Sequence, residues 1–288
     1  MELIKFLITG ILILFFILLV TQRGDYGMHP KIIWTYWDYP DKMPKTVKMC
    51  MEGWKKFNTD YEVILLTRGN YKNYVNIPEE IVKEPNFSDN PTRFADLVRV
   101  WALAEHGGVW IDSSIILKES LDNWLFPRPA EFSGFYIASF TKKGLPPVIE
   151  NWFFACTKGS EFVRRWRDEF SQIGKYPSVE KYVLSRKEMG VNYDGIGAPI
   201  YLAMHVSAQK VLQIDKYPLD SLVLRKAEDG PFRYLTENGW DSEKALKFAC
   251  KNKQYQGPIM KMRGDERKVL EPKIDSDFSV EKCGWLMP

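Results

Sequence analysis

The amino-acid sequence predicts an α/β domain built on a mostly parallel central sheet. Short runs rich in β-branched and aromatic residues, which favour strands, alternate along the chain with longer segments whose apolar residues recur at helical spacing. This alternation is typical of a parallel sheet that is covered by helices on both faces. A chain of 288 residues, 45% of them hydrophobic, is long enough to bury one sizeable core, so we expect one or two domains.

The expected strands and helices follow one another in a regular order. Strands are expected at residues 31–36, 61–67, 109–114, 133–140 and 150–157. Helices are expected at residues 44–57, 91–106, 160–173 and 198–210. The first of these helices is amphipathic because Val47, Cys50 and Trp54 fall on one face. The third begins at Ser160, a favoured capping residue.

The helix expected at residues 91–106 carries two charged residues on a largely apolar surface. Asn90 precedes it as a capping residue, and Gly107 is a natural end. Asp96 and Arg99 are three positions apart, so their side chains can touch. A helix that is apolar around most of its circumference is mostly buried, so we expect the pair to face a cleft. An internal ion pair that only ties the helix to a neighbour explains the same residues equally well.

A single carboxylate, Asp112, ends the short apolar strand that follows two glycines in "HGGVWIDSSI". Removing a charge from water costs several kcal/mol unless it is paired, so this residue needs a partner. A strand-ending Asp can simply accept hydrogen bonds in a turn. The alternative is a carboxylate that handles a metal or a phosphate at the tip of a central strand, where open α/β sheets place their sites.

Together, these elements resemble a known family of enzymes. The segment "TRFADLVRVWALAEHGGVWIDSSI" resembles the core motif of the glycosyltransferases with a DXD sugar-binding region, which form glycosyltransferase family 32. Within that family the capsular polysaccharide synthesis proteins are closest. Residues 29–67 resemble the opening strand, helix and second strand of the same family. The likeness is specific from Pro30 to about Asn123 and continues as fragments beyond.

The resemblance implies a GT-A-type domain and a glycosyltransferase. Such an enzyme moves a sugar, with retention at the anomeric carbon, from a UDP- or GDP-linked donor to a saccharide acceptor in polysaccharide or glycoconjugate synthesis. The family register implies that Trp37, in preference to Trp34, stacks on the nucleotide base, and aromatic stacking suits a flat base. It implies that Asp96 and Arg99 bind the hydroxyls of the donor sugar. It further implies that Asp112 binds Mn²⁺ or Mg²⁺ beside the diphosphate.

The motif departs from the family pattern at its third position, where Ser114 replaces the second Asp. A hydroxyl can ligate Mg²⁺ weakly but adds no charge, so tight metal binding and strict metal dependence are in doubt. Either another carboxylate completes the coordination of the metal, or lysine and arginine side chains stabilise part of the charge of the diphosphate. Lys261 and Arg263, on a segment able to close over the phosphates, are the candidates. On this interpretation Ser114→Asp restores a two-carboxylate site.

The remaining motifs point to no other chemistry. No catalytic base or nucleophile is implied, and Asp194 and His205 stay unassigned. The four cysteines share no CxxC spacing, so neither a zinc knuckle nor a redox pair is indicated. HExxH, Gly-x-Ser-x-Gly and glycine-rich phosphate loops are absent. The net charge of +3, without a basic stripe, does not favour nucleic acid as a partner.

The amino terminus predicts a membrane anchor. Residues 3–20 are almost wholly apolar, and as a helix they would be about 27 Å long, near the thickness of a hydrocarbon core. No small-x-small cleavage site follows. We therefore expect one transmembrane helix within residues 1–22, a short tether at 23–30 and a GT-A-like domain at 31–288. This makes a single-pass membrane protein whose orientation is open, because the flanking positive charges nearly balance.

Two other functions fit the sequence. One carboxylate and a cation could also direct water onto a sugar nucleotide, as in a metal-dependent phosphohydrolase. The weakened DXD motif also fits a non-catalytic, membrane-anchored carbohydrate-binding protein. Donor hydrolysis without an acceptor favours the first, and the absence of nucleotide binding favours the second.

Overall fold

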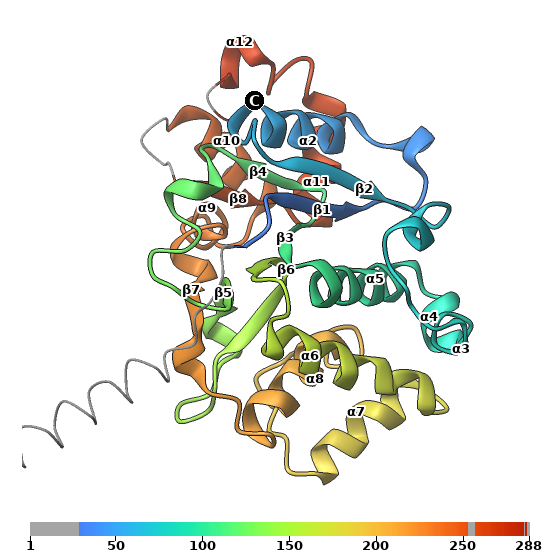
Figure 1. Cartoon of the computed structure of the whole chain (residues 1–288). Coiled ribbons are helices and arrows are strands. Elements are labelled where there is room, and N and C mark those ends of the chain that lie inside the picture. Colours follow the sequence, from blue (N-terminus) through green and yellow to red (C-terminus); the bar gives the residue numbers. More distant parts are fainter. Residues whose placement is uncertain (1–28, 253–256, 285, 287–288) are drawn as a thin grey trace, which may run out of the picture.

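A six-stranded sheet forms the centre of the molecule (Figure 1). The computed structural model describes residues 29–252, 257–284 and 286. In sheet order the strands are β2 (Glu62–Leu66), β1 (Ile32–Tyr36), β3 (Gly108–Ile111), β6 (Val148–Cys156), β5 (Phe132–Ile137) and β7 (Leu222–Lys226). Three neighbouring pairs are parallel, and β6 runs antiparallel to both β3 and β5. Five strands therefore share one direction, which confirms the predicted α/β domain with a mostly parallel sheet.

A second, two-stranded sheet brings the carboxyl-terminal part of the chain beside the end of β3. It consists of β4 (Ile115–Leu117) and β8 (Ile259–Lys261), which are antiparallel. Ile115 pairs with Lys261 in this sheet. Because β4 follows β3 after only three residues, this pairing places Lys261 next to Asp112.

Strand side chains alternate between the two faces of the main sheet, and each face is covered by helices. Trp34 and Trp110 belong to the core on one face, whereas Ile33 and Val109 belong to the core on the other. The first face is covered by α5 (Pro91–His106), α6 (Glu161–Ser171) and α8 (Ala203–Gln213). The second face is covered by α2 (Lys45–Phe57) and α10 (Ser242–Lys251), on the opposite side of the sheet in Figure 1.

The other helical segments are short. The α-helical ones are α3 (Glu79–Val82), α4 (Pro85–Ser88), α7 (Val179–Glu188), α9 (Arg233–Thr236), α11 (Gly264–Leu270) and α12 (Val280–Cys283). The 3₁₀ turns are η1 (Pro40–Lys42), η2 (Tyr71–Asn73), η3 (Leu121–Asn123), η4 (Ala138–Phe140), η5 (Gln172–Lys175), η6 (Leu219–Ser221), η7 (Ala227–Asp229) and η8 (Glu271–Lys273).

Helix α5 begins and ends where the sequence predicts. The side chain of Asn90 accepts a hydrogen bond from the backbone N–H of Arg93 at 2.9 Å, which caps the first turn. Gly107 and Gly108 have φ of +69° and +96°. A Cβ on Gly107 would lie 2.6 Å from the backbone nitrogen of Lys158, so the turn into β3 requires glycine.

The helix expected at residues 198–210 begins later, at Ala203. The preceding residues form a separate turn, in which the N–H of Leu202 donates to the carbonyl of Ala198 at 2.8 Å. This turn leaves Tyr201 exposed, with 67% of its surface accessible.

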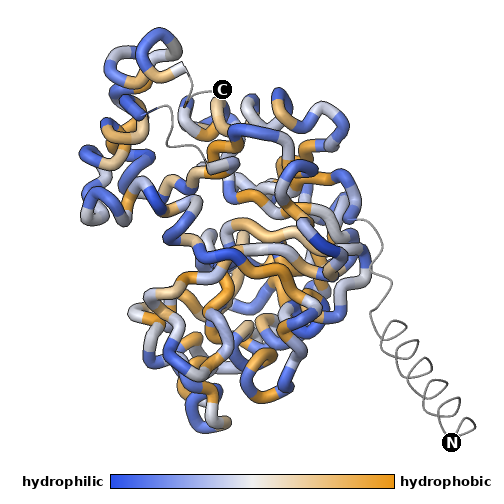
Figure 2. The backbone as a smooth tube through the Cα atoms, turned by 90° about the vertical axis from the view of Figure 1, so that its left-hand side faces the viewer, coloured by the Kyte–Doolittle hydropathy of each residue, from blue (hydrophilic) through white to orange (hydrophobic). Residues whose placement is uncertain are grey.

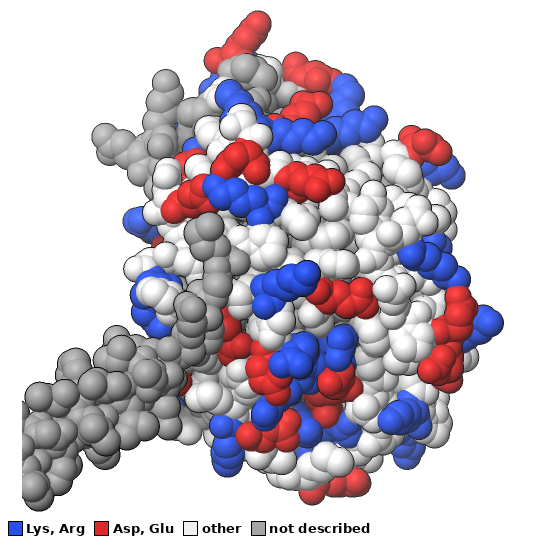
Figure 3. Space-filling model, in the orientation of Figure 1, with Lys and Arg blue, Asp and Glu red and all other residues white. Residues whose placement is uncertain are grey.

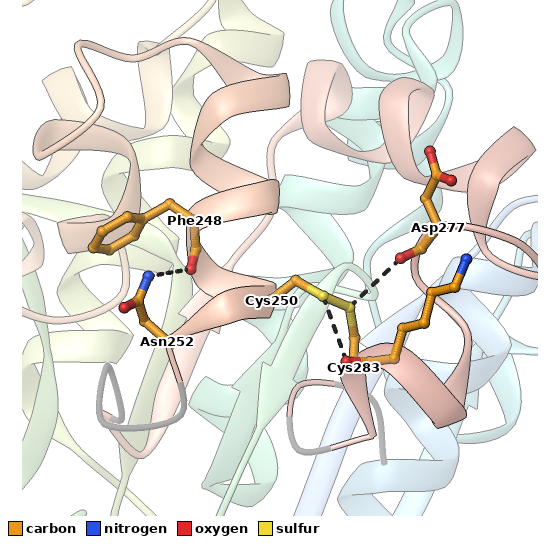
Figure 4. Close-up of a disulfide and its surroundings, with 6 residues drawn as sticks. Phe248, Cys250, Asn252, Asp277 and Cys283 are labelled. Atoms are coloured by element: carbon orange, nitrogen blue, oxygen red, sulfur yellow. Dashed lines mark hydrogen bonds between the residues drawn. A yellow bond between two sulfur atoms is a disulfide. The ribbon is translucent and has the colours of Figure 1, made fainter.

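A disulfide joins the end of α10 to α12 (Figure 4). It links Cys250 and Cys283, 33 positions apart in the sequence. The other two cysteines, Cys50 and Cys156, are buried and free. The spacing of the cysteines did not predict this pairing, because it depends on how two distant helices pack.

The described part of the chain does not support the predicted transmembrane helix or the single-pass membrane localisation that was expected from it. No helix in the described part of the chain is long and apolar enough to cross a membrane. The longest of the described helices, α5, has 16 residues, about 24 Å at about 1.5 Å per residue, against a hydrocarbon core of about 30 Å. The predicted anchor at residues 1–22 lies outside the described residues, as does the tether up to residue 28.

The hydropathy of the residues along the chain agrees with this layered arrangement. In Figure 2 the hydrophobic colour is most frequent toward the middle of the molecule, and much of the outer trace is hydrophilic. On the face shown in Figure 3, acidic and basic side chains are interspersed.

Candidate functional site

A large cleft opens at the carboxyl ends of β1 and β3. Its volume is about 1200 Å³, and its lining includes Trp37, directly after β1, and Asp112, directly after β3. These strands are parallel neighbours in which Trp34 pairs with Trp110, so their carboxyl ends meet at one edge of the sheet. This edge is where open α/β sheets place ligands.

Asp112 is the centre of a charged cluster in this cleft. One carboxylate oxygen, Oδ1, accepts hydrogen bonds from Nη2 of Arg99 at 2.8 Å and from the indole of Trp110 at 3.0 Å. The other, Oδ2, accepts from the ammonium of Lys261 at 2.9 Å. The Asp112 side chain is 26% exposed, whereas those of Arg99 and Lys261 are nearly buried. Asp112 is therefore in direct contact with Arg99 of α5.

The charges of the cluster control the ionisation of Asp112. Burial by itself would raise the pKa of this carboxyl group, but the ammonium of Lys261 and the guanidinium of Arg99 outweigh burial and hold the pKa below its ordinary value. Asp112 is thus an anion held between two cations.

Asp96 extends the cluster along α5. Its Oδ1 accepts hydrogen bonds from Nη1 of Arg99 at 2.6 Å and from the side-chain amide of Asn151, on β6, at 3.1 Å. Burial raises the pKa of Asp96 above its ordinary value despite the guanidinium of Arg99. Asp96 and Arg99 both line the cleft, as the helical pattern predicts.

Ser114 makes a different contact from the one that a metal-binding motif requires. Its hydroxyl donates to the carbonyl of Met262 at 2.8 Å, and its carbonyl accepts from the N–H of Met262 at 3.1 Å. These two bonds extend the pairing of β4 with β8 beyond Lys261. Ser114 therefore helps to hold Lys261 against Asp112.

Trp37 and Trp34 differ sharply in their surroundings. Trp34 is 2% exposed, donates its indole N–H to the carbonyl of Gly107 at 3.0 Å and stacks on His106. Trp37 is only partly buried and lines the cleft. Of the two, Trp37 is the one that a ligand in the cleft can reach. Its role in stacking on a base stays a prediction.

The residues around Asp112 do not fit a divalent cation held by the protein. Both oxygens of Asp112 already accept hydrogen bonds from cationic side chains, and the hydroxyl of Ser114 is directed at a carbonyl. A dication placed on this carboxylate would meet the charges of Arg99 and Lys261 at close range. No group of three or more His, Cys, Asp or Glu side chains suited to a metal occurs among the described residues.

Two arginines near Lys261 also line the cleft, and they differ in their partners. Arg263, a candidate from the sequence, is engaged by Glu266, with Nη2 2.7 Å from Oε1 and Nε 3.0 Å from Oε2. Arg267 lies with its guanidinium 5.7 Å from the ring centre of Trp37, and its buried Nε has no hydrogen-bond acceptor among the described residues. The sequence offered no signal for Arg267 beyond its position six residues after Lys261.

The cleft also contains a buried carboxylate and a buried imidazole, Glu150 and His205. Nε2 of His205, on α8, lies 2.9 Å from Oε2 of Glu150, on β6, and both residues line the cleft. The exposed aromatic side chains of Tyr201 and Trp240 line the same cleft. Asp194, the other unassigned residue, is exposed, 3.8 Å from Lys187, and does not line it.

Comparisons with known proteins give a family and several glycosyltransferases to which this chain is similar. Residues 21–195, more than half of the chain, match the family described as capsular polysaccharide synthesis protein. The O-glycosyltransferase braB of Annulohypoxylon truncatum is 29% identical over 162 residues, which cover 50% of this chain and 37% of that protein. The O-glycosyltransferase PaGT of Phomopsis amygdali is 28% identical over 159 residues, which cover 50% and 38%. The matched segment thus spans little more than a third of each relative.

A solved structure of the PaToxG glycosyltransferase aligns with 86% of this chain and 86% of its own, at 15% identity and a TM-score of 0.42. The matched family segment contains β1, α5 and β3, and with them Trp37, Asp96, Arg99 and Asp112. The narrower assignment to glycosyltransferase family 32 is compatible with these matches and stays a prediction. Because the family match covers most of the sheet and the strand ends that build the cleft, the chain belongs to the capsular polysaccharide synthesis protein family.

Proposed function

We propose that the protein is a glycosyltransferase that moves a sugar from a nucleotide-sugar donor to a saccharide acceptor. The observation that carries this proposal is the cluster of Asp96, Arg99 and Asp112 in one cleft at the carboxyl ends of parallel strands. The names of the two O-glycosyltransferase relatives and the family membership support it.

In this proposal the donor occupies the half of the cleft between Trp37 and Asp112. The ring of Trp37 stacks on the base, as aromatic side chains do on flat bases generally. Asp96 and Arg99 supply an acceptor and a fork of donors in fixed geometry, which suits the hydroxyls of the donor sugar. Asp112 orients Arg99 and Lys261, and Ser114 holds Lys261 in place.

The acceptor then occupies the other half of the cleft. Tyr201 and Trp240 present exposed aromatic faces to the cleft, on which the apolar faces of sugar rings can pack. The carboxylate of Glu150 takes its hydrogen bond from His205 on Oε2, so Oε1 can accept one from the attacking hydroxyl. Glu150 thereby orients that hydroxyl toward the donor sugar.

Retention at the anomeric carbon, which the family resemblance implies, is part of the proposal. The stereochemistry is read from the proton NMR coupling of the anomeric proton in the first product formed. A product of the same anomeric configuration as the donor supports retention, and the opposite configuration contradicts it.

The reaction class is tested with a panel of UDP- and GDP-sugars, each with and without oligosaccharide acceptors. The expected result is a glycosylated acceptor, detected by mass spectrometry, together with one released nucleoside diphosphate per transfer. Release that is equally fast without an acceptor, with no glycosylated product, would instead assign a sugar-nucleotide phosphohydrolase.

A further inference from the structure

Both carboxylate oxygens of Asp112 accept hydrogen bonds from positively charged side chains of the protein. Arg99 and Lys261 approach this carboxylate from two sides at 2.8 and 2.9 Å. Unit charges this close interact strongly in a partly buried site, and Arg99 also pairs with Asp96 at 2.6 Å, so the two cations and the two carboxylates of the cluster neutralise one another. Asp112 therefore has no unpaired negative charge to offer a divalent cation.

The serine at the third motif position contributes to the same arrangement. Ser114 is 5% exposed, and its hydroxyl and carbonyl both bond the backbone of Met262. This contact fixes the residue next to Lys261 in the sequence. The position that could hold a second metal-binding carboxylate is thus used to place an ammonium group beside the first.

A third cation, Arg267, lies on the side of the cleft nearest Trp37. Its guanidinium is 5.7 Å from the ring centre of Trp37, and no carboxylate of the described residues lies within ion-pair distance of it. Arg263, on the same segment, is instead neutralised by Glu266 at 2.7 Å. Arg267 thus lies beside the residue proposed for the base, and Lys261 contacts Asp112 at 2.9 Å; both cations line the cleft that would hold the diphosphate.

We propose that Lys261 and Arg267 form the binding site for the diphosphate of the donor, in place of a divalent cation held by the protein. The inference rests on the proposed function, because it assumes a nucleoside diphosphate group in the cleft. Both side chains are donors without acceptor capacity, and their hydrogen bonds to phosphate oxygens are charge-assisted. They stabilise the negative charge that develops on the leaving diphosphate.

The test is calorimetric titration of the full chain with UDP and with GDP, in excess EDTA and again in excess Mn²⁺. The expected result is that one nucleotide binds in EDTA with an affinity within about threefold of that in Mn²⁺. Arg267→Gln should weaken binding in EDTA by about 10- to 100-fold, the usual range for one charged hydrogen bond. Lys268→Gln, an exposed position next to Arg267 that does not line the cleft, is the matched control and should bind normally.

Lys261→Gln provides an independent result, because it frees one oxygen of Asp112. If the ammonium group of Lys261 takes the place of a metal ion, this variant should bind nucleotide weakly in EDTA. Mn²⁺ should then restore at least part of the lost affinity. The unmodified protein should show no such dependence of nucleotide affinity on Mn²⁺. If the Lys261→Gln variant does not fold, the comparison of Arg267→Gln with Lys268→Gln still tests the inference.

Nucleotide binding that disappears in EDTA, or that is unchanged in Arg267→Gln, would overturn the inference and leave the glycosyltransferase proposal standing. If neither nucleotide nor any nucleotide sugar of the panel bound under either condition, the proposed function itself would fail, and the inference with it.

Discussion

At the scale of single residues, the central finding is that Asp112 joins three separate parts of the chain. It follows β3, accepts a hydrogen bond from Arg99 on α5 and accepts another from Lys261 on β8. A turn-capping aspartate would interact only with its own turn. The contacts therefore favour the interpretation of Asp112 as a site residue over the simpler one.

The ionisation of Asp112 predicts how stability depends on pH. Its pKa is lowered in the folded chain, so between that value and the ordinary value of about 3.9 the unfolded chain binds more protons than the folded one. The stabilisation by Asp112 is therefore complete above about pH 5 and is lost as the pH falls below about 4.

Asp112→Asn should lower the free energy of unfolding by about 1–3 kcal/mol near pH 7, because two cations lose their anionic partner. Urea unfolding followed by tryptophan fluorescence should show this difference shrinking in acid. A difference that grew as the pH fell would mean that Asp112 is protonated in the folded protein.

Glu150 gives a prediction for the acceptor half of the cleft. Glu150→Gln keeps the shape of the side chain and removes its charge, so a hydrogen bond to the attacking hydroxyl is weakened. Turnover should fall by about 10- to 100-fold while nucleotide affinity stays unchanged. Glu188→Gln, on an exposed position outside the cleft, is the control. A loss of nucleotide affinity with normal turnover would place Glu150 on the donor side.

At the scale of elements, the sequence predicted the parts that local pattern determines. The helix α5, its cap at Asn90 and its glycine end followed from capping and turn chemistry. The strand β8 and the disulfide did not follow, because each depends on a pairing between segments far apart in the chain. Arg267 was missed for the same reason, since α11 reaches the cleft only through the pairing of β8 with β4.

The pairing of β4 with β8 changes what is expected of Ser114→Asp. The sequence alone predicts that this change restores a two-carboxylate metal site. In the structure the new carboxylate would face the carbonyl of Met262. Both groups are hydrogen-bond acceptors, and a buried contact between two acceptors with no proton between them is unfavourable. We expect a loss of about 1–3 kcal/mol in the free energy of unfolding and no tight Mn²⁺ binding. Tight binding of Mn²⁺ to this variant, measured by calorimetry without nucleotide, would show that the segment can rearrange into a metal site.

At the scale of the whole molecule, the carboxyl-terminal segment completes a site that the first half of the chain begins. It supplies Lys261 and Arg267 to the cleft, and its helices pack over the second face of the sheet. The Cys250–Cys283 disulfide ties α12, near its end, back to α10 (Figure 4). The integrity of this segment is therefore a condition for the site.

Removal of the disulfide should destabilise the molecule measurably. Closing a loop of 33 residues is worth about 3–4 kcal/mol in the chain-entropy model. Cys250→Ser with Cys283→Ser should lower the free energy of unfolding by about that amount, measured by urea titration. A reducing agent should lower the free energy of unfolding of the unmodified protein and leave that of the double variant unchanged. Equal stability of the two proteins under oxidising conditions would show that the bond does not form.

The turnover of Asp112→Asn shows whether the cluster around Asp112 serves sugar transfer. The measurement is the rate of nucleoside diphosphate release with the donor and acceptor that the unmodified protein uses, at pH 7, where the variant is folded. We expect release to fall by at least about 100-fold, because both Arg99 and Lys261 lose the anion that orients them. Release at a near-normal rate from the folded variant would contradict the account and make Asp112 a structural residue.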